Sequence, residues 1–119
     1  MSLDETRAVS PQELGRVAAP KAALVVFHSA YHAQQGQRFD LGEDDATLGR
    51  DAANTVVIAS DQASRRHARI FVSGGAHVLV DLDSTNGTFL NSKLVKEQTL
   101  RHGDVLRIVS TVLKYVVES

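Results

Sequence analysis

The chain has 119 residues, of which 43% are hydrophobic and 23% charged, which suits a single domain with a hydrophobic core. This composition excludes general disorder, and a net charge of −1 argues against a nucleic-acid-binding domain, which usually carries a basic excess. Because the chain has no cysteine, disulfides, zinc–thiolate sites and a cysteine nucleophile are all excluded.

Residues 1–20 are predicted to form an N-terminal tail that includes at most one short helix. The segment Ser10-Pro11-Gln12-Glu13 has the form of a capping box, and a helix that starts there would end before Pro20. The first residues lack the basic and then apolar pattern of a signal peptide, and no apolar run approaches the length of a membrane span. We therefore expect a cytoplasmic protein.

From residue 22 onward the sequence predicts one short β-strand after another. Hydrophobic and polar residues alternate with a period of two, and turn residues recur roughly every 8–12 positions, as in β-sandwiches. No stretch beyond residue 20 has a convincing helical period. The pattern favours an all-β sandwich. The clearest predicted strands are residues 24–27, 39–41, 55–58, 67–72, 78–82 and 112–117.

Two glycine-containing segments mark turns between these strands. Gly74-Gly75 is a strong signal for a hairpin between residues 67–73 and 76–82. His102-Gly103-Asp104 marks a further turn before the last predicted strand.

Three polar clusters lie at predicted strand boundaries, where loops on a rigid scaffold tend to carry function. Together they supply a guanidinium fork, hydroxyl groups, a second cation and a side-chain amide. Such a set is suited to holding a phosphate group and the peptide backbone beside it. The clusters are Gly49-Arg50, then Ser64-Arg65-Arg66-His67, then Ser84-Thr85-Asn86-Gly87-Thr88.

With these clusters in this order, the chain resembles the forkhead-associated (FHA) domain family. The resemblance is assigned to residues 21–119. It implies an eleven-stranded antiparallel β-sandwich that binds phosphothreonine-containing peptides through loops at one end. The residues that carry it are Leu48-Gly49-Arg50, Ser64-Arg65-Arg66-His67 and the run from Ser84 to Asn91.

Arg50, Ser64 and Arg65 are the candidate phosphate-binding residues. The guanidinium of Arg50 stays charged and presents a planar fork that matches phosphate oxygens, and each charge-assisted hydrogen bond contributes about 1.5–3 kcal/mol. The resemblance implies that the Ser64 hydroxyl binds the phosphate and that Arg65 lies near the phosphate and the peptide backbone. In isolation, Arg50 would be interpreted as a solvated turn residue and Ser64 as a residue that begins a strand.

Thr85 and Asn86 are the candidates for contact with the rest of the peptide. An asparagine side chain carries both a donor and an acceptor, so it can pair with a peptide backbone in both senses. By resemblance, Asn86 holds the main chain of the bound peptide and Thr85 adds a hydroxyl toward the phosphate. Asn-Gly is also a common turn, so residues 83–87 could have only that role.

Four further residues are assigned to the support of the site. Gly49 is interpreted as a backbone position too tight for a side chain. The resemblance makes His67 a residue that hydrogen-bonds the binding loops together, and Gly87 and Thr88 are assigned to the scaffold. Ser64 and His67 would face opposite sides of a strand, so a Ser–His catalytic dyad is a poor interpretation.

One departure from the family is visible, and two loops are candidates for specificity. The family commonly follows this stretch with Asn-Gly, whereas Asn91 is followed here by Ser92; the turn is still expected, because asparagine tolerates the left-handed region. Residues 42–46 and 59–63 are predicted to form the specificity surfaces.

The sequence therefore predicts a phosphopeptide-recognition module that acts as a signalling adaptor or regulatory domain. Its expected partner is a threonine-phosphorylated protein or peptide made by a Ser/Thr kinase, and attachment to further domains is expected. The alternative is a phospho-independent interaction or oligomerisation module. No nucleophile elbow, metal-ligand spacing or phosphate loop before a helix is present, so we expect no enzyme, cofactor, metal, nucleic acid or membrane partner. A phosphorylated Thr6 is a hypothetical internal ligand.

Overall fold

The computed structural model describes residues 17–118, so the predicted capping box at residues 10–13 and Thr6 lie outside the described part. Among the described residues, no helix is both long and apolar enough to cross a membrane. This part of the chain contains eleven strands: β1 (Ala22–His28), β2 (Arg38–Leu41), β3 (Ala46–Gly49), β4 (Val56–Val57), β5 (Ala68–Ser73), β6 (Ala76–Asp81), β7 (Thr88–Leu90), β8 (Lys93–Val95), β9 (Glu97–Thr99), β10 (Val105–Ile108) and β11 (Thr111–Val117).

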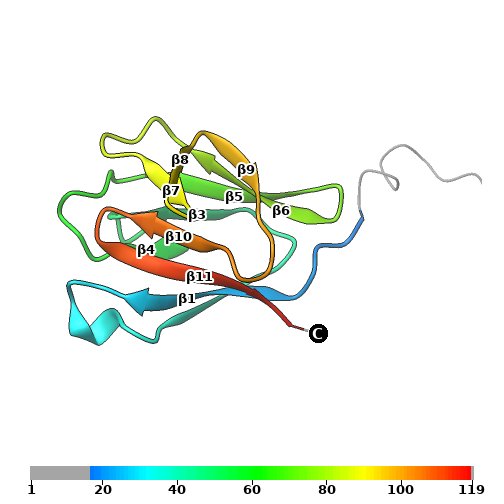
Figure 1. Cartoon of the computed structure of the whole chain (residues 1–119), viewed down its shortest axis with the longest axis horizontal. Helices are drawn as coiled ribbons and strands as arrows, with labels where there is room; N and C mark the ends of the chain where they lie inside the picture. Colours follow the sequence, from blue (N-terminus) through cyan, green and yellow to red (C-terminus); the bar gives the residue numbers. More distant parts are fainter. Residues whose placement is uncertain (1–16, 119) are drawn as a thin grey trace, which may run out of the picture.

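The strands form two packed sheets, which confirms the predicted eleven-stranded sandwich (Figure 1). The six-stranded sheet has the order β2-β1-β11-β10-β7-β8, and the five-stranded sheet has the order β4-β3-β5-β6-β9. One detail differs from an antiparallel sandwich. Strand β4 pairs with β3 in parallel, with Leu48 opposite Val56, because the chain after Gly49 turns back along β3 before it re-enters the sheet.

The core lies between the sheets and follows the period of two. In β11 the side chains of Thr111, Leu113 and Tyr115 are buried, while Val112 and Lys114 lie on the outer face. Leu, Ile, Val and Ala side chains from both sheets complete one apolar cluster. Full burial of each large aliphatic side chain contributes about 1.5–3 kcal/mol, so the fold rests on many medium-sized residues without any tryptophan.

Two tight hairpins have backbone conformations that their sequences predict. Gly74 and Gly75 have φ of 60° and 79°, and they join Ser73 to its partner Ala76 at the end of β5 and β6. The hairpin between β7 and β8 uses Asn91 at φ 50° and Ser92 at φ 70°. The turn predicted at Asn91-Ser92 therefore forms without glycine.

Replacing Ser92 by glycine is expected to stabilise the protein. A non-glycine residue in the left-handed region costs about 1–2 kcal/mol, part of which glycine loses again through its greater freedom in the unfolded chain. We expect Ser92→Gly to raise the free energy of unfolding by about 0.5–1 kcal/mol in urea titrations. Ser73→Gly, in an exposed strand position, should instead lower the free energy of unfolding by a similar amount. A change of the same sign in both variants would contradict this explanation.

A short 3₁₀ turn at His32–Gln34 (η2) was not predicted, because three residues are too few to show a helical period. The side chain of Gln34 is buried and acts as a substitute for a neighbouring strand. Its amide donates to the carbonyl of Val57 and accepts the backbone N–H of Ala59 at 3.1 Å. These bonds cover the free edge of β4, which would otherwise be open to pairing.

The strand directions place the three polar clusters at one end of the sandwich, on the left in Figure 1. β3 ends at Gly49, β5 begins at Ala68 and β6 ends at Asp81, and antiparallel pairing brings these ends together. The loop at residues 42–46 precedes β3 and therefore lies at the opposite end. The prediction that this loop is a specificity surface was therefore wrong, because the length of β3 separates it from the three clusters.

Candidate functional site

Arg50 is held at the end of β3 by the loop that leads into β5. Its backbone N–H donates to the carbonyl of Ser64 at 3.0 Å, and its side-chain Nε donates to the carbonyl of Ala63 at 3.1 Å. Among residues 17–118, the terminal nitrogens Nη1 and Nη2 form no hydrogen bond or ion pair, and the side chain is exposed. The guanidinium is thus held in place through Nε, while Nη1 and Nη2 can donate to a ligand.

Ser64 lies between Arg50 and the third cluster. Its hydroxyl oxygen accepts the backbone N–H of Thr85 at 3.1 Å, so the hydroxyl proton stays available for an acceptor outside the protein. Asn86 approaches the same loop, and its Nδ2 donates to the carbonyl of Gln62 at 2.8 Å. The structure therefore brings Arg50, Ser64, Thr85 and Asn86 together around residues 62–64.

His67 lies beneath these loops in the protein interior and hydrogen-bonds two of them. The ring is fully buried; its Nδ1 accepts the backbone N–H of Ser64 at 3.1 Å, and its Nε2 lies 2.8 Å from the carbonyl oxygen of Gly87. A carbonyl only accepts, so Nε2 is the ring nitrogen that donates, to the carbonyl of Gly87. Both ring nitrogens are committed to backbone groups, and neither faces the Ser64 hydroxyl.

Gly49 allows two backbone segments to cross in close contact. A Cβ at this position would lie 2.2 Å from the carbonyl oxygen of Arg65 and 2.9 Å from Nδ2 of Asn54. That Nδ2 donates to the carbonyls of Asp51 and Arg65, at 2.8 and 2.6 Å. Asn54 is buried and fixes the Arg50 loop against Arg65. It was missed in the sequence, where a polar residue in a turn gave no sign of burial.

Asp81 organises the third cluster, and it was not among the predicted site residues. Its Oδ1 accepts the hydroxyls of Ser84 and Thr88, each at 2.6 Å, and its Oδ2 accepts the N–H of Ser84 at 3.1 Å. Ser84 Oγ in turn accepts the N–H of Gly87 at 2.9 Å. The signal available in the sequence was an aspartate three residues before a serine at a strand end, which is typical of a side-chain-closed turn.

These bonds change the acidity of Asp81. Partial burial acts to raise its pKa, but the bonds from the Ser84 hydroxyl, the Thr88 hydroxyl and the Ser84 N–H outweigh burial and lower the pKa below its usual value. The ionised carboxylate thus stabilises the fold above the pKa of the unfolded chain. That stabilisation is lost as the pH falls through the lower pKa of the folded state.

Asp81→Asn is expected to lower the free energy of unfolding by about 2 kcal/mol at pH 7, because an amide nitrogen cannot accept the Ser84 N–H. The difference from the wild type should begin to shrink as the pH falls below about 4, where aspartate in the unfolded chain is protonated, and should be lost below the lower pKa of Asp81 in the folded state. Urea titrations between pH 3 and 7 measure both effects. Asp83→Asn is the control, because Asp83 is exposed and lies 3.8 Å from Lys96; a pH-independent loss for Asp81→Asn would contradict the assignment.

The rim of this cluster is cationic. Arg65 and Arg66 are exposed, and neither forms an ion pair within the described part of the chain. Arg69 differs, because its guanidinium pairs with Asp45 at 2.9 Å, toward the other end of the sandwich. Of the predicted supporting residues, Thr88 is fully buried and Gly87 has φ of 85°, which favours glycine. Within residues 17–118, no three His, Asp or Glu side chains are grouped as metal ligands.

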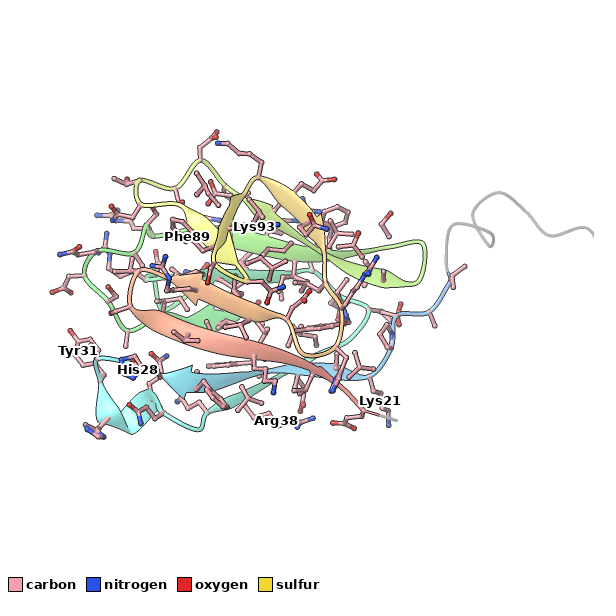
Figure 2. All side chains as sticks on the ribbon, in the orientation of Figure 1. Lys21, His28, Tyr31, Arg38, Phe89 and Lys93 are labelled. Atoms are coloured by element: carbon pink, nitrogen blue, oxygen red, sulfur yellow. The ribbon has the colours of Figure 1, made fainter. Side chains whose placement is uncertain are left out.

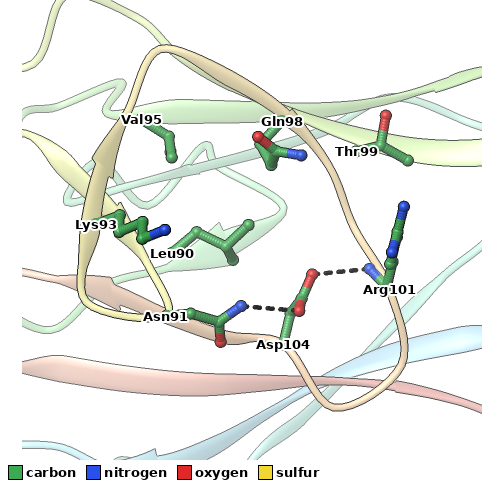
Figure 3. A pocket seen from close by; sticks show the side chains of 8 residues that line it. All are labelled: Leu90, Asn91, Lys93, Val95, Gln98, Thr99, Arg101 and Asp104. Atoms are coloured by element: carbon green, nitrogen blue, oxygen red, sulfur yellow. Dashed lines mark hydrogen bonds between the residues drawn. The ribbon is translucent and has the colours of Figure 1, made fainter.

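A separate hollow of about 390 Å³ lies between β7, β8, β9 and the loop at 101–104 (Figure 3). Asp104 is at its edge, where it accepts the Asn91 Nδ2 at 2.9 Å and the Arg101 N–H at 2.8 Å. Asn91 lies at the opposite end of β7 from Gly87, and no residue of the three clusters lines this hollow. Asp104 holds the hairpin at Asn91, and the hollow is not part of the candidate site.

The sequence pattern of the FHA domain matches residues 46–109, which is more than half of the chain. The chain belongs to the FHA domain family. The matched range contains the positions of the five predicted binding residues, Arg50, Ser64, Arg65, Thr85 and Asn86.

Two relatives illustrate the resemblance in sequence. This FHA domain is 38% identical over 80 residues to the FHA domain-containing protein FhaB of Mycolicibacterium smegmatis, covering 66% of this chain and 52% of FhaB. It is 34% identical over 73 residues to the glycogen accumulation regulator GarA of the same organism, covering 61% of this chain and 46% of GarA. The chain thus spans about half the length of these relatives.

Solved structures share the fold. An FHA domain studied for phosphothreonine-dependent interactions superposes with a TM-score of 0.74 at 28% identity, covering 83% of this chain and 98% of that one. EmbR of Mycobacterium tuberculosis, solved in complex with a low-affinity phosphopeptide, superposes with a TM-score of 0.73 at 28% identity, covering 84% of this chain and 25% of EmbR.

Proposed function

We propose that this FHA domain binds phosphothreonine-containing segments of a partner protein and acts as an adaptor or regulatory module. The observation that carries the proposal is the convergence of Arg50, Ser64, Thr85 and Asn86 on residues 62–64. Within residues 17–118, the terminal nitrogens of Arg50 and the hydroxyl proton of Ser64 have no partner. We assign the domain to residues 21–119, because β1 and β11 pair from Ala22 and Val117 onward.

Each residue has a distinct role in this proposal. Nη1 and Nη2 of Arg50 and the hydroxyl of Ser64 donate to phosphate oxygens, and the exposed cation of Arg65 adds attraction for the dianion. Asn86 pairs with the peptide main chain, and the Thr85 hydroxyl completes the phosphate contacts. Gly49, His67, Gly87 and Thr88 hold the loops that carry these groups.

Two kinds of relative support the proposal. EmbR is described in complex with a phosphopeptide, and GarA is named as a regulator. A further relative, the oxoglutarate dehydrogenase inhibitor of Corynebacterium glutamicum, is 29% identical over 107 residues. We infer that the present chain likewise acts by binding and not by catalysis, since both nitrogens of the nearby His67 are occupied by backbone groups. The cytoplasmic location and the attachment to further domains stay predictions.

The deciding experiment compares peptides that differ only in phosphorylation. A phosphothreonine peptide library and its unphosphorylated counterpart are titrated by fluorescence polarisation, and we expect binding of the phosphorylated form alone, with a Kd on the order of micromolar, about −8 kcal/mol. Equal affinity for both forms would favour the phospho-independent interaction module instead.

The affinity is also expected to fall as salt rises. The contact is formed by exposed cations and a dianion, so raising the ionic strength from about 0.1 to 1 M shortens the screening length from about 10 to 3 Å. We expect the Kd for a phosphothreonine peptide to increase several-fold over this range. A Kd that does not change with salt would contradict an ionic binding mode.

A further inference from the structure

A row of three side chains crosses the outer face of the six-stranded sheet beside the candidate site. Phe89 pairs with Leu94 across β7 and β8, and with Arg107 across β7 and β10. Thr88 and Leu90 point into the core, so Phe89 between them points outward (Figure 2). Leu94 is 66% exposed, which is unusual for a large aliphatic side chain with a core available to it.

This row is continuous with the third cluster. A groove of about 270 Å³ is lined by Thr85, Asn86 and Gly87 of the third cluster together with Phe89, Leu94 and Asp81. Gly87 has no side chain, and a Cβ there would lie 2.6 Å from Cδ1 of Leu94 and 3.5 Å from Cε1 of Phe89. The apolar side of the groove therefore begins directly at the backbone of the loop that presents Asn86.

The groove is flanked by positive charge. The guanidinium carbon of Arg107 lies 4.2 Å from the centre of the Phe89 ring, and its Nη1 donates to the carbonyl of Val109 at 2.9 Å. Arg107 has no acidic partner among residues 17–118. Lys96, which also lines the groove, has only the distant and exposed Asp83 beside it. The surface thus combines the apolar side chains of Phe89 and Leu94 with Arg107, unpaired within the described residues, beside them, while the Asp81 carboxylate that also lines the groove is already bonded to the Ser84 and Thr88 hydroxyls.

We propose that this groove binds an apolar side chain of the same partner segment that carries the phosphothreonine, and that a carboxylate of that segment lies beside Arg107. The inference rests on the proposed function. Asn86 and Leu94 line one groove, and four extended residues span about 13 Å, so the apolar residue lies within four positions of the phosphothreonine. The preferred ligand is then a phosphothreonine with a large aliphatic or aromatic neighbour and an acidic residue next to it.

The test is a peptide library with a fixed phosphothreonine and four randomised positions on each side. It is selected on the wild-type protein, on Leu94→Ser and on the control Phe27→Ser. Phe27 is 69% exposed on the same sheet and has a cation, Lys114, near its ring at 5.9 Å, but it does not line the groove. The wild type and Phe27→Ser are expected to select Leu, Ile, Val or Phe at one position, with Asp or Glu adjacent.

Leu94→Ser should retain binding to phosphothreonine but lose the apolar selection. For the best wild-type peptide, we expect Leu94→Ser to raise the Kd about 10-fold and Phe27→Ser to change it less than twofold. Arg107→Glu should remove the acidic preference and leave the apolar one in place.

The possible failures can be told apart. If the wild type binds phosphothreonine peptides without any apolar selection, or if Leu94→Ser keeps the same selection, the groove is not a subsite and the proposed function stands. If the wild type binds no phosphothreonine peptide in the library, the proposed function and this inference both fail.

Discussion

Arg50→Ala is expected to abolish binding of phosphothreonine peptides. The terminal nitrogens of Arg50 are the proposed donors to two phosphate oxygens, and each charge-assisted bond contributes about 1.5–3 kcal/mol. Loss of both should raise the Kd more than about 100-fold. Fluorescence polarisation against a peptide that the wild type binds measures the change, and circular dichroism checks that the sandwich is intact.

Two further variants separate the guanidinium fork from charge alone. Arg66→Ala removes one exposed cation from the same rim and should change the Kd less than about threefold, because an exposed, screened charge contributes little. Arg50→Lys keeps the charge but loses the planar fork, so we expect a loss of at least about 10-fold. If Arg50→Ala still binds the peptide, or if Arg66→Ala loses as much affinity as Arg50→Ala, the role assigned to Arg50 is wrong.

Gly49→Ala is expected to be the most destabilising single methyl addition among the site residues. Its Cβ would lie 2.2 Å from the carbonyl oxygen and 2.8 Å from the carbonyl carbon of Arg65, and these are backbone atoms that cannot rotate away. The two segments must separate, which strains the bonds from Arg50 N–H to Ser64 and from Asp51 N–H to Arg65. We expect the free energy of unfolding to fall by about 3 kcal/mol.

Thermal and urea unfolding measure this loss, which corresponds to a Tm about 10 °C lower for a domain of this size. Gly42→Ala is the matched control, because a Cβ at Gly42 would meet no atom within 4 Å. That change should be neutral or stabilise by about 0.5 kcal/mol. Comparable losses in the two variants would show that crowding at Arg65 is not the cause. Gly49→Ala should also weaken phosphopeptide binding, since it displaces Arg50.

Several site features could be predicted because they depend on local chemistry. The alternation of apolar residues indicated the strands, and Gly74-Gly75 and Asn91-Ser92 carry turn signals that act over four residues. The interpretation of Gly49 as too tight for a side chain matches its contact with Arg65. Each of these inferences needed only neighbouring residues or a motif whose members are close in the chain.

Other features could not be predicted, because they depend on which strand ends meet. The loop at 42–46 adjoins Arg50 in sequence, yet the four residues of β3 carry the chain to the other end of the sandwich. Asn54 and Asp81 look like ordinary turn residues, and only their burial and their bonds to Arg65, Ser84 and Thr88 show that they hold the loops. A polar residue reveals its structural role only when its partners are known.

By itself, the sequence determined an all-β fold, the type of its turns and the identity of the groups suited to a phosphate, because backbone preference and side-chain chemistry are properties of single residues and short segments. The tertiary structure alone decided that Ser64 accepts the Thr85 N–H and that Phe89 and Leu94 continue the rim onto the sheet face. Pairing between distant strands sets those contacts, and it is fixed by the packing of the whole core and not by any one segment.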